Sequence, residues 1–482
     1  MSKLFLFITA ASLFLTCACQ KMDNMPTDSL KDIQNLETKG EVPLNPLDRF
    51  AVSLNDAKRY AELYRPGDSF VVSPYVEGRD TLLYVFNYKE GWMVLSGDRR
   101  TYPVIAQGAK GSIKINETSG YGFWLKLYAL GISELKIDET KKENEYTVIW
   151  KALSPARTGP KRPATKADAK WVIREAMINE FSDYVATVPP LIQTKWGQTA
   201  PWNNNYPLDT YYNNKCYVGC EAVALAQVLY YWHNYAGVPT KLFHTISSSN
   251  SIYSGYVYSD GFLTINYVED IGFFRNNETN NSSRWNDMAL SATSGGNTGY
   301  VGDFMLDIGN RIGMSYTGVA SKASFLNAAT PLAQYYGFSY NYRHAPAESY
   351  IKEQLQYNRP VIIRSTSSYS SSGGTINHTW VIDGYTSEHQ YYSMLRYCEL
   401  STEWGLDDEV YDTFEEAQAV YGFSAPYDML PFSREIVRDH LHMNWGEDGE
   451  GDGIYSSLNW YYAEYGCVFS HTDMDTCSLY FN

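Results

Sequence analysis

The chain has 482 residues, a length that favours two or three domains over a single core. Hydrophobic residues make up 44% of it and charged residues 19%, proportions that exclude a disordered chain. The net charge of −15 argues against a nucleic-acid partner, because binding to phosphates needs a basic surface.

The first 19 residues have the pattern of an export signal. Lys3 gives a positive start, residues 4–15 form an apolar run too short to span a bilayer, and small residues precede Cys19. The stretch "LTCACQ" resembles a bacterial lipoprotein signal, which implies a lipid on Cys19; an ordinary secretory signal is the alternative. We therefore expect an exported protein, at the cell surface or in the periplasm, that touches the membrane only through this lipid.

The next part of the chain predicts a small folded unit behind a tether. Residues 20–45 are polar and lack the apolar side chains needed for a core. Apolar residues then recur at spacings of three and four up to residue 65, with Asp48 or Ser53 as the cap of an amphipathic helix. Two β-prone runs, 81–88 and 91–96, flank Lys89 and Glu90 and predict a hairpin. These elements indicate an α+β domain over residues 46–155.

A change of composition marks the next boundary. The stretch "SPARTGPKRPATKADAK" combines prolines with cationic residues, and predicts an exposed linker over residues 156–170 that is suited to proteolytic nicking. A plain interdomain linker is the alternative. Residues 171–482 have no repeat and are assigned to one domain. Its acidic stretch at 385–440 is interpreted as solvated loops, with an acidic rim that favours basic substrates as the second interpretation.

Cys220 is the first candidate for chemistry. Residues 221–235 have apolar side chains at helical spacing without Gly or Pro, so Cys220 follows Gly219 at the start of a helix. The positive end of the helix dipole favours a thiolate, whereas the charge of Glu221 partly opposes it. An inert buried thiol is the alternative. Five cysteines remain behind the signal, and an odd number leaves at least one unpaired in the monomer.

Partners for such a nucleophile occur elsewhere in the sequence. His378 follows a Gly-rich turn at the start of a buried strand, where an imidazole is held rigidly and acts as base and acid. Asn444 is suited to accept the far imidazole proton, and Trp445 to shield that bond from water. Gln198 is a neutral amide donor for an oxyanion hole, together with the Cys220 backbone N–H.

These residues carry a resemblance to the streptopain family of papain-fold cysteine peptidases. The blocks "TKWGQTAPWN", "GCEAVALAQVLYYWHNY", "NHTWVIDGY" and "MNWG" are similar to the family's four motifs in order, and residues 46–155 resemble its inhibitory propeptide. The resemblance implies an α+β fold, in which a papain-like domain with a helical part and an antiparallel sheet part follows a small α+β propeptide domain. It implies catalytic roles for Cys220, His378, Gln198, Asn444 and Trp445.

Three features depart from the family pattern. Glu221 stands where family members often carry a small or β-branched residue, Asn377 stands where they often carry a small one, and the Gly/Trp-rich tail after "NWG" becomes "EDGEGDG". Glu221 and Asn377 are the two that bear on the alternatives. They keep open a second hypothesis, a surface protein that binds peptide or glycan on a catalytically impaired papain-like frame. A papain-fold acyl transferase is a third hypothesis.

Other ligands are less favoured by the sequence. Cys216 and Cys220 have a spacing compatible with a disulfide or a metal pair, but no second pair accompanies them. The stretch "DGEGDG" at 448–453 imitates half of a calcium loop, but Asn459 stands at its twelfth position instead of glutamate. We expect no cofactor and no metal. The expected partners are protein or peptide substrates and the chain's own propeptide, and the expected function is a cysteine endopeptidase made as a zymogen.

Overall fold

The structure is a computed structural model that describes residues 50–116, 118–137, 144–152, 169–234, 256–259, 262–265, 281–323, 339–344, 347–368, 375–402, 409–456 and 472–480. The predicted signal at 1–19, the tether at 20–45 and nearly all of the linker at 156–170 lie outside these residues. In the described part of the chain, no helix is both long enough and apolar enough to cross a membrane.

The N-terminal unit combines helices and antiparallel strands. Its helices are α2 (Leu54–Tyr64), α3 (Gly120–Ile137) and α4 (Glu145–Ala152), and its strands are β1 (Phe70–Glu77), β2 (Asp80–Tyr88), β3 (Trp92–Ser96) and β4 (Val104–Gly108). The predicted amphipathic helix is confirmed as α2. Of its two candidate caps, Ser53 is the one used, and its hydroxyl accepts from the Asp56 N–H at 3.1 Å.

The predicted hairpin is confirmed as β2 and β3. Gly91 closes it with φ +82°, and a Cβ there would lie 2.3 Å from the Gly108 carbonyl oxygen, so only glycine fits the turn. Among the described strands, β1 pairs only with β2 and forms the edge of the sheet. Pro74 lies in this edge strand, the kind of strand in which a sheet tolerates proline.

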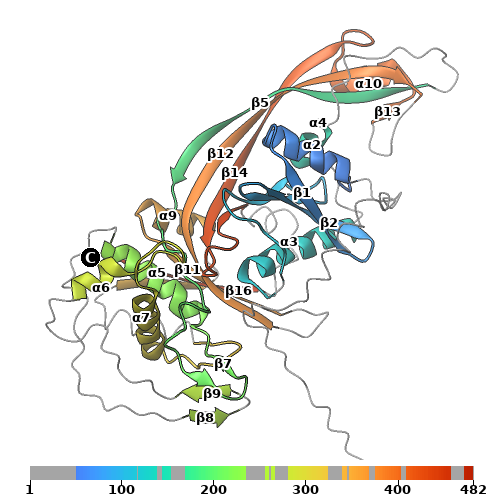
Figure 1. The fold of residues 1–482 in the computed structure, drawn as a ribbon. Helices are drawn as coiled ribbons and strands as arrows, with labels where there is room; N and C mark the ends of the chain where they lie inside the picture. Colours follow the sequence, from blue (N-terminus) through green and yellow to red (C-terminus); the bar gives the residue numbers. More distant parts are fainter. Residues whose placement is uncertain are drawn as a thin grey trace, which may run out of the picture.

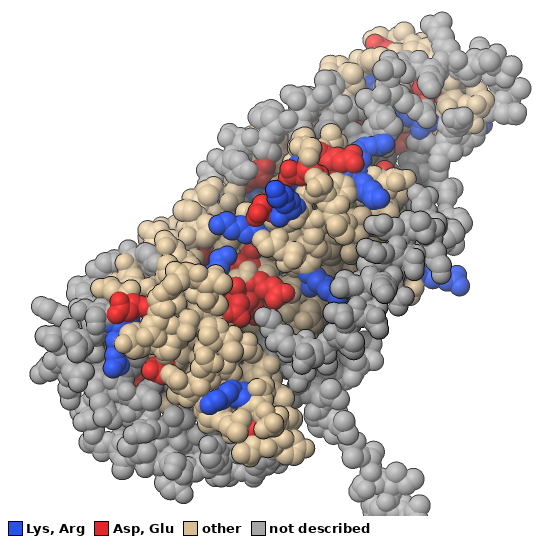
Figure 2. Space-filling model, viewed as in Figure 1, with Lys and Arg blue, Asp and Glu red and all other residues tan. Residues whose placement is uncertain are grey.

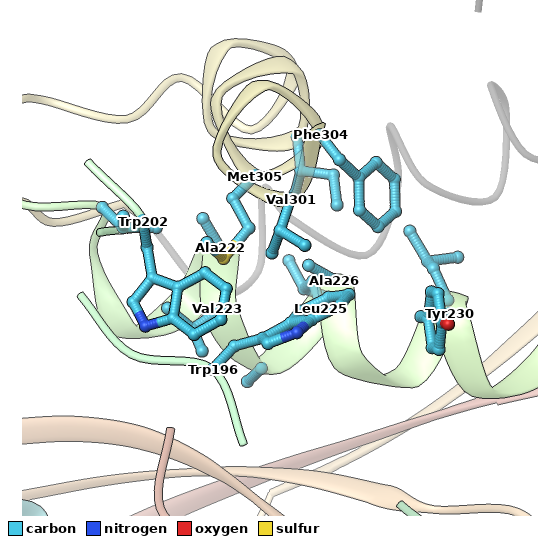
Figure 3. Packing of buried hydrophobic residues seen from close by; sticks show 14 of the residues in the cluster. Trp196, Trp202, Ala222, Val223, Leu225, Ala226, Tyr230, Val301, Phe304 and Met305 are labelled. Carbon is cyan, nitrogen blue, oxygen red and sulfur yellow. The ribbon is translucent and has the colours of Figure 1, made fainter. Parts of the chain in front are cut away.

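A helical part follows, centred on α5 (Cys220–Asn234). Around it lie α6 (Asn281–Asp287), α7 (Thr298–Arg311) and two short hairpins, β6 (Leu208–Asp209) with β7 (Asn214–Lys215) and β8 (Tyr256–Ser259) with β9 (Phe262–Ile265). The predicted helix at 221–235 is confirmed as α5. Figure 3 shows Val223 and Leu225 of α5 among Trp196, Trp202 and Met305, which are all buried. Burial on nearly all sides fixes this helix in place.

The remaining strands continue the sheet of the N-terminal unit. They are β10 (Ser339–His344), β11 (Val361–Ser368), β12 (Thr375–Ser401), β14 (Met429–Asn444), β15 (Gly453–Ser456) and β16 (Thr472–Tyr480), and α9 (Glu348–Gln356) precedes β11. Among the described residues, neighbouring strands follow the order β1-β2-β3-β4-β15-β14-β12-β11-β16-β10, and each of these pairs is antiparallel. The α+β class, with a helical part beside an antiparallel sheet, is confirmed.

Most of the described residues of the stretch 385–440 lie in strands and a helix, so the interpretation of this stretch as solvated loops is wrong. β5 (Lys170–Val188), β12 and β14 form a long three-stranded arm that extends away from the helical part, with α10 (Phe414–Tyr421) and β13 (Val410–Tyr411) near its far end (Figure 1). Tyr392 and Met394 of the arm are buried against the N-terminal unit.

The N-terminal unit and the sheet share their hydrophobic cores. One cluster joins Trp124 and Ile132 of α3 to Trp380 and Trp445, and a second joins α2 and α4 to the arm. β4 also pairs with β15, where Tyr455 lies opposite Ala106. The N-terminal unit is therefore integrated into the structure through both side chains and a continuous sheet.

Candidate active site

Cys220 is the first residue of α5, and its position depends on the glycine before it. Gly219 has φ +92°, and a Cβ there would lie 2.7 Å from the Met314 methyl carbon. Glycine adopts this positive φ without strain and leaves room for the Met314 methyl group, so the chain can turn sharply into the helix at this position. The thiol is not part of a disulfide and is 8% exposed. It lies at the positive end of the helix dipole, which favours a thiolate.

His378 lies in β12 and is 1% exposed. Its Nε2 donates to the backbone carbonyl of Trp445 at 3.0 Å, and the imidazole is also hydrogen-bonded to Cys220. Burial alone would lower the pKa of His378. The hydrogen bond and charge of Cys220, the charge of Glu447 and the Trp445 carbonyl outweigh burial and raise this pKa to about 9. The structure therefore favours an imidazolium, the partner that a thiolate needs.

Trp445 covers the histidine from the side of the sheet. It is fully buried, its ring centroid lies 6.1 Å from that of His378, and it stacks on Trp380 at 5.0 Å. Trp380 lies nearly parallel to the imidazole on the same side. Two indoles therefore exclude water from the bond between His378 and the Trp445 carbonyl.

Asn444 does not take the place that the sequence predicts for it. Its side-chain oxygen accepts from Gln227 Nε2 at 2.9 Å and from the Gly446 N–H at 3.2 Å, and its amide donates to the Thr194 carbonyl at 2.9 Å. The acceptor for His378 is instead the backbone carbonyl of the next residue. The reason is the buried Gln227, whose amide needs a partner and finds it in Asn444.

Gln198 lies next to the nucleophile. Its backbone carbonyl accepts from the Val218 N–H at 3.0 Å, which fixes it two residues from Cys220, and its side chain is 7% exposed. The loop that carries it is anchored by Trp196, whose indole donates to the Ala289 carbonyl at 2.7 Å. The structure thus brings together Cys220, His378, Gln198 and Trp445, while the side chain of Asn444 faces a separate hydrogen-bond network.

Glu447 is a site residue that the sequence reasoning missed. One of its carboxylate oxygens, Oε1, lies 3.7 Å from His378 Nε2 and accepts from the Gly120 N–H of α3 at 2.7 Å. Burial raises the pKa of Glu447 to about 7, although the charge of His378 and the Gly120 N–H lower it. Its position two residues after Trp445 is the sequence feature that could have placed it near His378.

The start of α3 covers the histidine directly. A Cβ on Gly120 would lie 2.3 Å from His378 Cδ2 and 2.4 Å from Nε2, so the helix backbone is in van der Waals contact with the imidazole. Tyr121 donates from its hydroxyl to Glu450 Oε1 at 2.9 Å, and Tyr128 donates to the Ser456 carbonyl. The N-terminal unit therefore closes the site from the side of the histidine.

The acidic loop at 446–452 has structural hydrogen-bond roles. Asp452 accepts from the Trp445 N–H at 2.9 Å, and Asp448 accepts from the Trp202 indole. On the face shown in Figure 2, acidic side chains gather near the middle of the molecule, while lysines and arginines are scattered. Across the described residues, no group of three or more His, Cys, Asp and Glu side chains is arranged to hold a metal ion.

The other described cysteines are chemically different from Cys220. Cys216 and Cys398 are free and fully buried, and Cys216 is therefore not disulfide-bonded to Cys220. Burial raises the pKa of Cys216 to about 12 and that of Cys398 to about 11, which leaves both as inert thiols. Cys467 and the side chain of Cys477 lie outside the described residues.

Comparisons with known proteins give one family and two solved structures. Residues 196–398 match the model of the peptidase C10 family. No curated protein matches the chain in sequence. A fragment of Prevotella intermedia prointerpain A is 18% identical, with 84% of this chain and 98% of the fragment covered and a TM-score of 0.47. The active wild-type interpain A cysteine protease of the same organism is 23% identical, with coverages of 61% and 95% and a TM-score of 0.38.

Proposed function

From the match of residues 196–398 to the peptidase C10 family model, we propose that the chain is a cysteine endopeptidase made as a zymogen. The observation that carries the proposal is the Cys220–His378 pair. The thiol lies at a helix N-terminus and is hydrogen-bonded to an imidazole whose pKa is raised to about 9. This is the pairing that cysteine nucleophiles use near neutral pH.

The proposed reaction begins with attack of the Cys220 thiolate on the carbonyl carbon of a peptide bond. The negative charge that develops on the carbonyl oxygen is held by the Gln198 side-chain amide and the Cys220 N–H. The His378 imidazolium then gives its proton to the leaving amine, so that the C–N bond breaks and a thioester remains. Water, deprotonated by the neutral His378, hydrolyses the thioester and restores the thiol.

The N-terminal unit is proposed as the intramolecular inhibitor. Its helix α3 contacts His378 through Gly120, and the Gly120 N–H donates a hydrogen bond to the Glu447 carboxylate. Its strand β4 pairs with β15 and so extends the sheet. These contacts support an inhibitory role because a peptide substrate has to approach the same imidazole. Cleavage in the basic linker at 156–170 is the proposed route to the mature enzyme.

Export and anchoring are further parts of the proposal. A lipid on Cys19 would attach the zymogen to the membrane ahead of the N-terminal unit, so that cleavage in the linker would release the catalytic part. Incorporation of a fatty-acid analogue tests the anchor, and its absence would contradict it. N-terminal sequencing of the active species tests the cleavage site.

Replacement of the nucleophile tests the proposed reaction. Cys220→Ala should abolish peptide hydrolysis while the protein keeps the thermal stability of the wild type, because the side chain is small and already free of a disulfide. Full activity in this variant would contradict the proposal. Products that depend on an added amine acceptor, with little hydrolysis, would favour the acyl transferase instead.

A further inference from the structure

Glu221 is an unusual neighbour for a nucleophilic thiol. Its side chain is 3% exposed, and the Cys220 thiol donates to Glu221 Oε2 with the sulfur 3.4 Å from the oxygen. The thiol therefore lies between two proton acceptors, this carboxylate and the His378 imidazole. A charged carboxylate without a counter-charge would be costly in such a site.

A positive charge on β11 acts on this carboxylate. Arg364 lowers the pKa of Glu221 electrostatically, and its Nε donates to the side-chain oxygen of Asn377 at 2.8 Å. Asn377 is the residue directly before His378. Glu221 and Asn377, which both depart from the family pattern, thus both interact with Arg364, Glu221 through charge and Asn377 through a hydrogen bond.

We propose that Glu221 is a positioning residue whose carboxylate holds the Cys220 thiol proton, with Arg364, bound to Asn377, as a positive charge that favours the ionised form of Glu221. The inference rests on the proposed function and deepens it, because it says which residue sets the protonation of the proposed nucleophile. A carboxylate in contact with the sulfur disfavours the thiolate and favours the imidazolium. Both ionisations of the pair therefore move to higher pH than in a pair without Glu221.

Several charged groups act on the pair. Burial raises the pKa of Glu221 and outweighs its own backbone N–H, Arg364, Cys220 and His378, which each lower it. From the loop after β14, Glu447 adds a second negative charge on the far side of His378. Glu447 stabilises the imidazolium but is not in contact with the sulfur, so Glu221 is the residue that controls the thiol.

The test is the pH profile of Cys220 alkylation by iodoacetamide in the full-length chain, with the adduct mapped by mass spectrometry. In Glu221→Gln the midpoint of the alkylation profile should fall by about one to three pH units relative to the wild type, the range that one adjacent charge produces. Glu353→Gln removes a charge from the exposed face of α9 and is the matched control, with an unchanged profile. Coincident profiles for wild type and Glu221→Gln would overturn the proposal.

Two further variants keep the test decisive. Glu221→Val replaces the carboxyl with an apolar side chain suited to a buried position, and should lower the midpoint in the same direction even where the glutamine variant is unstable. In an Arg364→Met background, Glu221→Gln should shift the midpoint of the alkylation profile by less, because the Glu221 carboxyl is then more easily protonated. If the two substitutions instead shift the midpoint additively, Arg364 does not act through Glu221, and that part of the proposal is wrong. The readout needs no peptide hydrolysis. A shifted profile in a chain that cleaves no peptide would refute the proposed function alone.

Discussion

The contact between α3 and His378 predicts that one methyl group separates the start of α3 from the histidine. In Gly120→Ala the new Cβ would lie 2.3 Å from His378 Cδ2, more than 1 Å closer than an ordinary contact. The imidazole cannot retreat, because Trp445 holds it through a hydrogen bond of 3.0 Å. The start of α3 therefore has to lift, which also lengthens the bond from the Gly120 N–H to Glu447.

Overpacking of this kind costs about 1–3 kcal/mol, which corresponds to an opening equilibrium about 5-fold to 150-fold more favourable. The assay is the rate at which a bulky maleimide labels Cys220 in the intact full-length chain, and the rate should rise by a factor in this range. The matched control is the same substitution in a His378→Ala background, where the missing ring removes the clash and the ratio should approach one. An unchanged labelling rate in a folded Gly120→Ala protein would refute the reasoning.

Three other predictions concern single side chains. Gln198→Ala should lower kcat by about 100-fold to 1,000-fold with a small change in KM, because one oxyanion donor is lost; steady-state kinetics that stay within threefold of the wild type would contradict this role. Asn444→Ala leaves the Gln227 amide and the Thr194 carbonyl without their partner, so calorimetry should show destabilisation by about 1–3 kcal/mol. An unchanged unfolding temperature would argue against that network. Burial raises the pKa of Glu447 to about 7 from its ordinary value of about 4.5, so the folded protein binds this proton more tightly than the unfolded chain does. The stability lost to this group therefore accumulates as pH rises from about 4.5 to about 7. Glu447→Gln should therefore gain thermal stability relative to the wild type over this interval, and a constant difference would contradict the assignment.

Local sequence patterns predicted the elements around the nucleophile correctly. Periodic apolar residues and Gly219 predicted a helix that begins at Cys220, and the two β-prone runs at 81–88 and 91–96 predicted a hairpin. The resemblance to the streptopain family is confirmed by the match of residues 196–398 to the peptidase C10 model. These features depend on spacing within a few residues, which a single sequence contains.

Long-range pairing could not be predicted in the same way. β12 extends for 27 residues because β5 and β14 bind along both of its edges and the N-terminal unit buries one face, and none of these partners is adjacent in sequence. The same limit explains Asn444. Its preferred partner depends on Gln227, a residue that only the packing of α5 brings to it.

The contact of Glu447 with Gly120 is another long-range interaction that the sequence could not predict. It joins residues 327 positions apart, and only the docking of α3 on the catalytic part creates it. The sequence marked the stretch after Trp445 as acidic, but the role of each carboxylate follows from the acceptor that it provides for a particular backbone N–H.

The central claim is that Cys220 is a nucleophile activated by His378. Its most direct test is labelling of the matured protein with an irreversible epoxide inhibitor of cysteine peptidases, followed by mapping of the adduct. We predict stoichiometric modification of Cys220 at neutral pH, and its loss in His378→Ala. An unreactive Cys220 in the matured wild type, or equal labelling without the histidine, would contradict the claim and favour a binding protein on a papain-like frame.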